Sequence, residues 1–537
     1  MSYCSPLYFL IILPIAVLLY GITPQKHRSK VLLIISYAFF WSISQKLLIY
    51  LIISTFSIHH FGLWLNHIKN ERDSVLKETE KEKKKEIKEQ YNKKERRVLL
   101  LAVLLHIGCL VVLKYTPFFL TNINSLLKLW KVSFQFKIPK MLIPIGISFY
   151  SLQAVSYITD VHNEKIKADS NLGRLALFMS FFPGIMEGPI VRYSDTAEKL
   201  WEGTPINYHN LTFGIQRILW GLLKKIVIAD RLNEFILEVF KDYVSFDGGI
   251  ILLAVIFYTI QLYMEFSGTM DVVIGSAEIF NVKMPENFKQ PFLSKTINEF
   301  WRRWHITLGA WFKDYIFYPV SLSKPMKKLT MFGRKKLGNH FGPLLAGAIA
   351  LFCVWLCNGL WHGSAWNFIF FGMYHFVFIL LENIFEPYVI KLCEKIHINR
   401  QSKLYHLFQI VKTTIIVMFG ELFFRAETLK IGFGMFKKIF TDFTLKGLKH
   451  SNLVTIGIGL KDIVIVAITL IIVFTVNILR EKNINIREKI AEKHIVIRWL
   501  IYYGLIFYVL IFGAYGANYI PIDPIYANFD GGAYGEV

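Results

Sequence analysis

The sequence predicts an α-helical protein that crosses a membrane several times. Of its 537 residues, 54% are hydrophobic and 16% are aromatic. The apolar residues stand in long runs, whereas soluble domains have short, periodic ones. The runs show no strand-type alternation, which argues against a β-barrel. We therefore expect an all-α polytopic integral membrane protein with about ten to twelve membrane helices, some of them re-entrant or interfacial.

The apolar runs supply the candidate membrane segments. Several are shorter than the roughly 20 residues that cross a bilayer, so they must extend into their flanks or enter only part of the way. Nothing basic precedes the first run and no small-residue cleavage site follows it, which favours a retained anchor over a cleaved signal. The runs are 7–22, 31–43, 47–65, 98–112, 250–264, 344–357, 368–381, 410–424, 463–478 and 500–512.

The formal charge of +22 is typical of basic cytoplasmic loops in a membrane protein, so we expect no nucleic-acid partner. Basic loops occur at 25–30, 67–97 and 323–336, and 67–97 holds 12 Lys/Arg against 8 Asp/Glu. Two expected crossings separate the first two loops, which places both in the cytoplasm and the N-terminus outside. Charges in 67–97 alternate at helical spacing, as in a solvated helix with i,i+4 ion pairs or in a partner-binding arm.

Several common catalytic motifs are absent. The chain has no GxSxG, Walker A, HExxH or GxGxxG pattern, and its five cysteines show neither CxxC nor zinc spacing. His59 and His60 are adjacent, and His362 and His375 would lie about 220° apart around a helix. We therefore predict no metal site.

The segment 357–367, "CNGLWHGSAWN", places an ionisable side chain, His362, between two apolar runs. Asn358-Gly359 is typical of a helix C-terminus, and Ser364 could cap a helix that begins near Ala365. His362 would then occupy a break between two helices at membrane depth. A buried neutral histidine there is a candidate general base; the alternative is a structural histidine bonded to a carbonyl.

The segment 298–319, "NEFWRRWHITLGAWFKDYIFYP", predicts one amphipathic helix at the membrane interface. His305 falls on its apolar stripe, as either a packed core histidine or a functional one. On a helical wheel, one stripe comprises Trp301, His305, Leu308, Phe312 and Tyr315, and the opposite stripe comprises Glu299, Arg302, Arg303, Lys313 and Asp314.

Three further segments, 141–160, 181–193 and 261–280, mix apolar residues with glycine, proline and a few polar side chains. Such segments line cavities or form kinked, closely packed helices. Glu265 and Asp271 are the best candidates for functional carboxylates. The alternative is that they bond the backbone or pair with arginine.

These segments together resemble the membrane-bound O-acyltransferase family, and most closely its bacterial alginate-O-acetylation branch. The resemblance rests on the order and spacing of "IPIGISFYSLQAVSYITDV", "FFPGIMEGPIVRY", "MPENFKQPFLSKTINEFWRRWHITLGAWFKDYIFYP", "LWHGSAWNFIFFGMYH" and "FGELFFRAET". It implies a ring of membrane helices, thinned at the centre, with a tunnel and a funnel meeting near the signature histidine. His362 matches that catalytic histidine, and His305 matches the second histidine of the branch.

The resemblance also implies an organisation of the chain. Residues 1–66 would be N-terminal membrane helices, 67–97 a charged cytoplasmic loop or helix, 98–430 the catalytic core, and 431–537 C-terminal membrane helices and a tail. Two departures from the family concern "GIMEGPI" and the C-terminus, where 525–529 only loosely echoes an aromatic motif of relatives that docks a partner.

The implied reaction moves an acyl group, with acetyl favoured, from a cytoplasmic thioester to hydroxyls of an extracellular or cell-wall polysaccharide. The donor would be acetyl-CoA or an acyl-carrier thioester, with no bound cofactor. His362 would act as general base or orient the thioester, and His305 would assist. Backbone N–H groups at Gly363-Ser364 could stabilise the oxyanion. Candidate substrate or tunnel residues are Trp361, Gly363, Ser364, Asn367, Glu265, Ser267, Asp271, Trp304 and Glu187.

The implied partners are the lipid bilayer, the polysaccharide acceptor, an extracytoplasmic acetyltransferase-like protein and, for a carrier-bound donor, an acyl-carrier protein. The expected location is the plasma membrane of a bacterium. Alternatives are D-alanyl transfer to teichoic acid from a carrier protein, a transporter or flippase without acyl chemistry, and a non-catalytic scaffold. A transporter predicts inverted repeats, and the sequence shows no convincing halves.

Overall fold

The computed structural model describes residues 2–515, so the C-terminal segment 525–529 lies outside the described residues. All regular elements in the described part are helices. These residues form two compact units. The first comprises the residues up to Ile215 together with Val273–Pro285, and the second comprises Gln216–Val272 and the chain from Glu286 onward.

Eight helices in the described part are long and apolar enough to cross a membrane. Each apolar run of the sequence lies within a helix, and the first run forms the shorter apolar helix Tyr8–Ile22. In lipid, a helix satisfies every backbone polar group within one segment. The protein is therefore a multi-pass membrane protein. The eight candidates are Gln25–Glu78, Lys84–Leu129, Gly248–Ile279, Lys324–His362, Trp366–Lys395, Lys403–Arg425, Leu460–Glu481 and Ile495–Phe512.

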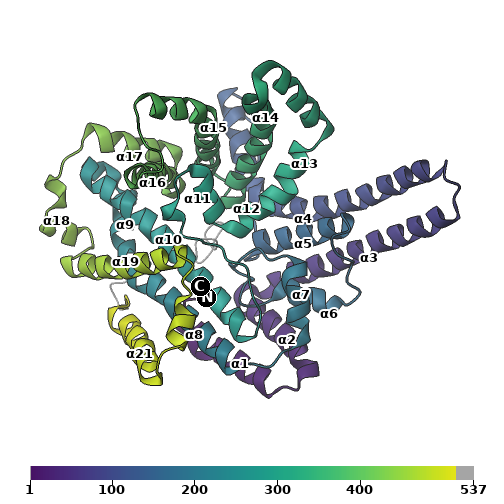
Figure 1. Cartoon of the computed structure of the whole chain (residues 1–537), viewed down its shortest axis with the longest axis horizontal. Helices are drawn as coiled ribbons and strands as arrows, with labels where there is room; N and C mark the ends of the chain where they lie inside the picture. The colour runs from purple at the N-terminus through teal and green to yellow at the C-terminus, as the bar shows by residue number, and fades with distance from the viewer. Residues whose placement is uncertain (1, 516–537) are drawn as a thin grey trace. The chain divides into compact units, whose positions relative to one another are not determined.

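The first unit contains the N-terminal helices and a long antiparallel pair, α3 and α4, which run side by side (Figure 1). Its elements are η1 (Tyr8–Ile12), α1 (Leu13–Ile22), α2 (Gln25–Ser44), η2 (Gln45–Leu47), α3 (Leu48–Glu78), α4 (Lys84–Leu129), α5 (Ile147–His162), α6 (Leu172–Ser180), α7 (Tyr193–Glu202) and the first part of α8 (Tyr208–Leu222).

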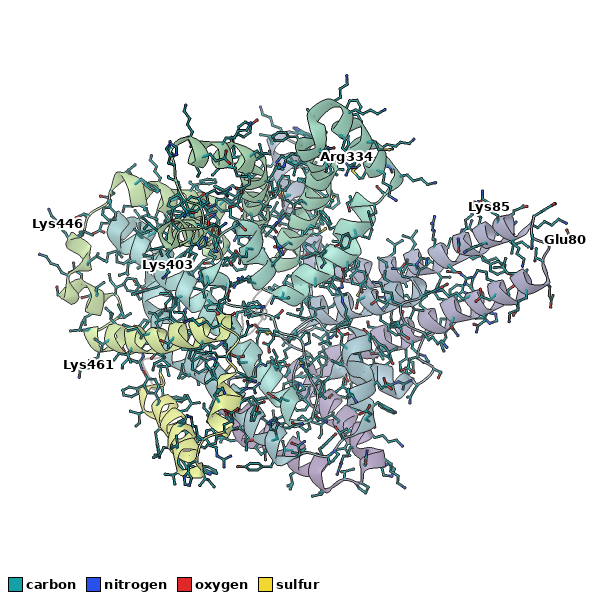
Figure 2. All side chains as sticks on the ribbon, viewed as in Figure 1. Glu80, Lys85, Arg334, Lys403, Lys446 and Lys461 are labelled. Carbon is teal, nitrogen blue, oxygen red and sulfur yellow. The ribbon has the colours of Figure 1, made fainter. Side chains whose placement is uncertain are left out.

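The charged segment 67–97 is helical, as its charge spacing predicts, and a short turn between Glu78 and Lys84 divides it between α3 and α4. Figure 2 shows Glu80 and Lys85 at the far end of this pair. Among the pairs described at this tip is Lys83 with Glu80, at 3.8 Å on exposed side chains.

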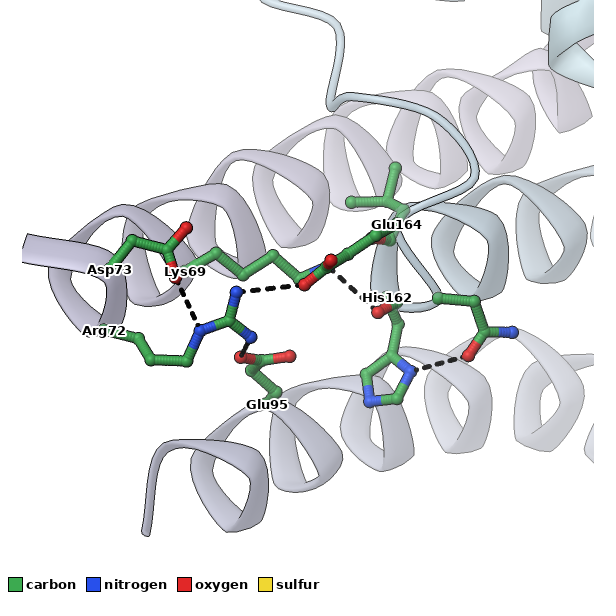
Figure 3. Close-up of polar contacts among 8 residues, drawn as sticks. Lys69, Arg72, Asp73, Glu95, His162 and Glu164 are labelled. Carbon is green, nitrogen blue, oxygen red and sulfur yellow. Dashed lines mark hydrogen bonds and ion pairs between the residues drawn. The ribbon is translucent and has the colours of Figure 1, made fainter. Parts of the chain in front are cut away.

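A buried ionic cluster joins the two long helices further back (Figure 3). The Arg72 guanidinium donates to Glu95 at 2.9 Å and to Glu164 at 3.0 Å. Lys69 donates to the carbonyls of Val161 and His162, at 2.7 and 2.9 Å, at the end of α5. A cation at a helix C-terminus is stabilising, so the cluster ties α3, α4 and α5 together.

The second unit contains the remaining long helices. Its elements are η3 (Leu223–Ala229), η4 (Asp230–Leu232), α9 (Asn233–Lys241), η5 (Tyr243–Ser245), most of α10 (Gly248–Ile279), η6 (Pro291–Leu293), α11 (Ile297–Arg303), α12 (Ile306–Phe312), η7 (Lys313–Phe317), α13 (Tyr318–Ser321), α14 (Lys324–His362), α15 (Trp366–Lys395), α16 (Lys403–Arg425), α17 (Leu429–Thr441), η8 (Lys446–Leu448), α18 (His450–Thr455), α19 (Leu460–Glu481), α20 (Ile486–Ala491) and α21 (Ile495–Phe512).

The single amphipathic helix predicted over 298–319 is wrong. α11 ends at Arg303 and α12 begins at Ile306, with His305 between them in the left-handed conformation (φ 45°, ψ 53°). This conformation is uncommon outside glycine, so surrounding contacts must hold it. The wheel therefore placed residues on opposite faces of a helix that does not continue.

The predicted helix end at Asn358-Gly359 is also wrong, although the break itself exists. α14 continues to His362, and α15 begins at Trp366 with Ala365 as its N-cap and no side-chain cap from Ser364. Gly359 serves close packing instead: a Cβ there would lie 2.5 Å from the carbonyl oxygen of Phe368 in α15. A small residue lets two membrane helices approach, so this glycine does not mark a helix end.

Candidate active site

His305 occupies the break between α11 and α12 and is held there by Asn287, from the "MPENF" segment. The Ile306 N–H donates to the Asn287 carbonyl at 3.0 Å. The Thr307 N–H and hydroxyl donate to Oδ1 of Asn287 at 3.1 and 2.7 Å. Nδ1 of His305 lies 3.4 Å from the same oxygen. Asn287 thus fixes both the strained backbone of His305 and one edge of its ring.

These contacts select one tautomer of His305. Oδ1 of Asn287 accepts from a backbone N–H, so it is an acceptor toward Nδ1 of His305 as well. Nδ1 must then carry the proton, and Nε2 holds the lone pair of the neutral ring. Burial disfavours the charged imidazolium and lowers the pKa of His305 to about 3. His305 is therefore a neutral imidazole whose Nε2 carries the free lone pair.

His362 is the last residue of α14 and is buried among aromatic rings. Its ring centroid lies 5.0 Å from Trp361, 5.9 Å from Phe371 in α15 and 5.1 Å from Phe424 in α16. Three helices of the second unit therefore position this histidine.

His305 and His362 line one cavity of about 630 Å³. The Trp361 ring contacts both, with centroid distances of 5.7 Å to His305 and 5.0 Å to His362. The two histidines come from elements 57 residues apart in the chain, so the second unit brings together the two side chains that the motifs single out.

The lining of this cavity is apolar apart from a few polar groups. Arg302 and Lys313 are the two basic side chains in the lining, and no carboxylate lines the cavity. Both cations are exposed, and neither forms an ion pair with any residue in the described part of the chain. The helical wheel placed Arg302 and Lys313 opposite His305. Because the helix breaks at His305, all three side chains instead line one cavity. An anionic group is the ligand that this charge balance favours.

Gly363 and Asn367 follow His362 in the chain and pack against neighbouring residues. A Cβ on Gly363 would lie 2.3 Å from the Phe368 ring, so the residue fits only without a side chain. Asn367 donates to the Ala426 carbonyl at 3.0 Å and joins α15 to the end of α16. Trp304 lines the cavity and stacks on Phe300. Ser364 does not line the cavity.

The predicted carboxylates lie away from the cavity lining. Asp271 pairs with Arg217 at 3.0 Å and with Lys224 at 2.7 Å, which favours the structural alternative. Ser267 accepts from Lys224 at 2.9 Å. Glu265 is buried in α10, where its oxygens accept no hydrogen bond from the described residues.

Glu187 belongs to the first unit, where it is buried and interacts electrostatically with Tyr3. It is not among the cavity residues, all of which belong to the second unit. In residues 2–515, no group of three or more His, Cys, Asp or Glu is arranged to hold a metal ion.

Sequence reasoning missed Asn287 and misread Asn358. Asn287 stands in the quoted "MPENF", but its partner His305 is 18 residues away, so no local signal connects them. Asn358 was interpreted as a helix stop, whereas its side chain lines the cavity.

Comparison with known proteins gives a family match over part of the chain and relatives over most of it. Residues 98–333 match the model of MBOAT, the membrane-bound O-acyltransferase family. A "probable alginate O-acetylase" of Azotobacter vinelandii is 29% identical over 464 residues, covering 86% of this chain and 82% of that protein. Residues 98–333 therefore contain a region similar to the membrane-bound O-acyltransferases, and His305 lies within it. Over 86% of its length the chain is similar to a protein named for acyl transfer.

Two other relatives match shorter regions of this chain. A peptidoglycan O-acetyltransferase of Helicobacter pylori is 32% identical over 312 residues, covering 53% of this chain and 55% of that protein. A teichoic acid D-alanyltransferase of Bacillus subtilis is 32% identical over 248 residues, covering 45% of this chain and 60% of that protein. The named activities of all three relatives are acyl transfers.

Proposed function

We propose that this protein transfers acetyl groups from a cytoplasmic thioester to hydroxyl groups of a polysaccharide outside the membrane. The observation that carries the proposal is the single cavity lined by His305 and His362. The relatives favour acetyl as the acyl group, because the alginate O-acetylase match extends over 86% of the chain and the D-alanyltransferase match over 45%.

The reaction needs a base for the acceptor hydroxyl. As a base takes the hydroxyl proton, the hydroxyl oxygen attacks the thioester carbonyl carbon and a C–O bond forms. The carbonyl oxygen carries negative charge in the tetrahedral intermediate. The C–S bond then breaks, and the proton passes to the departing sulfur, which leaves as a thiol. No proton is gained or lost overall, so one histidine could serve as base and then as acid.

His362 takes the role of that base, or orients the thioester, and His305 assists through Nε2. Two features of the site support these roles. A neutral imidazole is required of a base, and the Asn287 contact keeps His305 in a defined tautomer. His362 is buried among aromatic rings, which shields its imidazole from bulk water.

Acetyl-CoA or an acetylated carrier protein is the donor that suits the cavity. Both present a thioester at the end of a pantetheine arm that carries phosphate. Apolar walls would bind the arm, while Arg302 and Lys313 would attract the phosphate. Replacing both cations with alanine is expected to raise the KM for acetyl-CoA more than the KM for a phosphate-free acetyl-pantetheine thioester.

The acceptor polysaccharide would reach the site from the outer face of the membrane. Thioesters are made in the cytoplasm and surface polysaccharides lie outside, so one site must be reached from both faces. The basic loops, among them 67–97, would face the cytoplasm. An extracytoplasmic acetyltransferase-like protein is the proposed partner that completes transfer to the polymer.

The direct test uses purified protein in liposomes with radiolabelled acetyl-CoA and mannuronate oligosaccharides. Wild-type protein should release CoA thiol and label the sugar. His362→Ala should reduce both by about 100-fold or more while the variant stays folded in the membrane. Equal transfer by His362→Ala would overturn the role of His362, and labelling only from a D-alanyl carrier protein would favour the D-alanyl alternative.

A further inference from the structure

Asn358 lies one helical turn before His362, on the same face of α14. The helix is continuous from Asn358 to His362, and residues four apart on a helix are neighbours. Both side chains line the cavity of about 630 Å³. A small group held next to the His362 imidazole is therefore within reach of the Asn358 amide as well.

The amide of Asn358 is unusual because neither its Oδ1 nor its Nδ2 has a hydrogen-bond partner among the described residues. The residue is only 9% exposed, and its Oδ1 is shielded from solvent and accepts no hydrogen bond from the described residues. A buried amide without partners is destabilising, and buried polar groups are nearly always bonded. Within a membrane helix such a group is expected to serve a ligand.

Other asparagines nearby show the normal arrangement. Asn383 also lines the cavity, but its amide donates to the Ile379 carbonyl at 2.8 Å. Asn367 donates to the Ala426 carbonyl at 3.0 Å. Asn358 is thus distinguished from them by an amide that the described protein leaves available to whatever enters the cavity.

The carbonyl oxygen of the transferred acyl group needs a hydrogen-bond donor, and the Asn358 amide has one. When the hydroxyl attacks, negative charge develops on the carbonyl oxygen, and a positioned N–H donor stabilises it. A neutral histidine that accepts the hydroxyl proton cannot donate to that oxygen with the same nitrogen. Trp301 also presents an unbonded indole N–H, but its ring is packed between Trp355 and His375 at 4.9 and 4.7 Å.

We propose that the side-chain amide of Asn358 donates a hydrogen bond to the carbonyl oxygen of the acyl group and stabilises the oxyanion during transfer. This inference rests on the proposed acetyl transfer at His362. It assigns the oxyanion contact to a side chain of α14, in place of the backbone at Gly363-Ser364, where the Gly363 N–H already points to the Gly359 carbonyl at 3.4 Å.

The decisive variant is Asn358→Leu, which keeps the approximate shape and removes the amide. Purified variants in liposomes are compared by thiol release from acetyl-CoA with mannuronate oligosaccharides, and by thermal stability. Asn358→Leu should lower kcat by about 100-fold, with KM for acetyl-CoA changed less than threefold. Its thermal stability should equal or exceed that of wild type, because an unpaired buried amide is removed.

Matched variants separate the possible causes. Asn358→Asp, which cannot donate when ionised, should lose at least as much turnover, and Asn358→Gln should retain part of it. Cys357→Ala alters the neighbouring residue, which does not line the cavity, and should behave as wild type. Trp301→Phe should lose less turnover than Asn358→Leu; a larger loss would transfer the role to Trp301.

The outcomes distinguish this inference from the proposed function. If Asn358→Leu turns over at the wild-type rate, the role of Asn358 is overturned while the proposed function stands. Loss of turnover together with loss of folding in Asn358→Leu would also overturn it, because a structural amide would then be the cause. Absence of thiol release by wild type would count against the proposed function and this inference together.

Discussion

Oδ1 of Asn287 lies 3.4 Å from Nδ1 of His305 while it accepts two hydrogen bonds from Thr307. This one oxygen stabilises the left-handed backbone at His305 and sets the tautomer of its ring. Asn287, which lies outside α11 and α12, therefore decides which nitrogen of His305 carries the free lone pair.

Asn287→Ala should lower kcat by about 10- to 100-fold, because His305 loses the acceptor that orients its ring. The KM for acetyl-CoA should change little, since Asn287 does not line the cavity. Thr307→Val, which removes one bond to the same oxygen and leaves the His305 contact, is the control and should lose less. Equal losses in kcat would show that the contact between Asn287 and the His305 ring is not the cause.

His305 should make the folded state less stable as the pH falls below about 6.5. Burial lowers the pKa of His305 to about 3, whereas an unfolded histidine has a pKa of about 6.5. Between these values the unfolded chain binds a proton that the folded chain does not, so stability falls with the pH. The measurement is the change in Tm between pH 7 and pH 5, compared with His305→Gln. The variant should show the smaller change; parallel changes would contradict a neutral, buried His305.

Gly363→Ala should distort the turn that carries His362, because its Cβ would lie 2.3 Å from the Phe368 ring. We expect lower turnover and a lower Tm than wild type. The double variant Gly363→Ala/Phe368→Leu provides space for the methyl group and should recover part of both. Failure of the double variant to recover either property would show that Phe368 is not the obstacle.

Arg72→Ala should destabilise the first unit by about 3 to 5 kcal/mol, because it leaves Glu95 buried without its cation. The matched control is Lys83→Ala, which removes an exposed pair with Glu80 at the tip of the same helices and should leave the Tm unchanged. Thermal unfolding in detergent measures both. A Tm for Arg72→Ala equal to that of the control would show that the cluster contributes nothing net.

The sequence predicted the ten apolar runs and the motifs around His305 and His362, because both signals are local. An apolar run in lipid has to be helical, since no water satisfies its backbone, and every run is indeed helical. The sequence did not predict the helix boundaries near these two histidines. Asn358-Gly359 favours a helix end by local propensity, but packing of Gly359 against Phe368 in α15 overrides that propensity.

The sequence by itself determined a multi-pass helical protein that resembles the membrane-bound O-acyltransferase family, and it singled out two histidines. Tertiary structure decided that α11 stops before His305, because Asn287 holds that residue in a left-handed conformation from 18 positions away. It also decided that His305, His362 and the unsatisfied Asn358 line one cavity. Such contacts join residues far apart in the chain, and helical periodicity describes only residues within one helix.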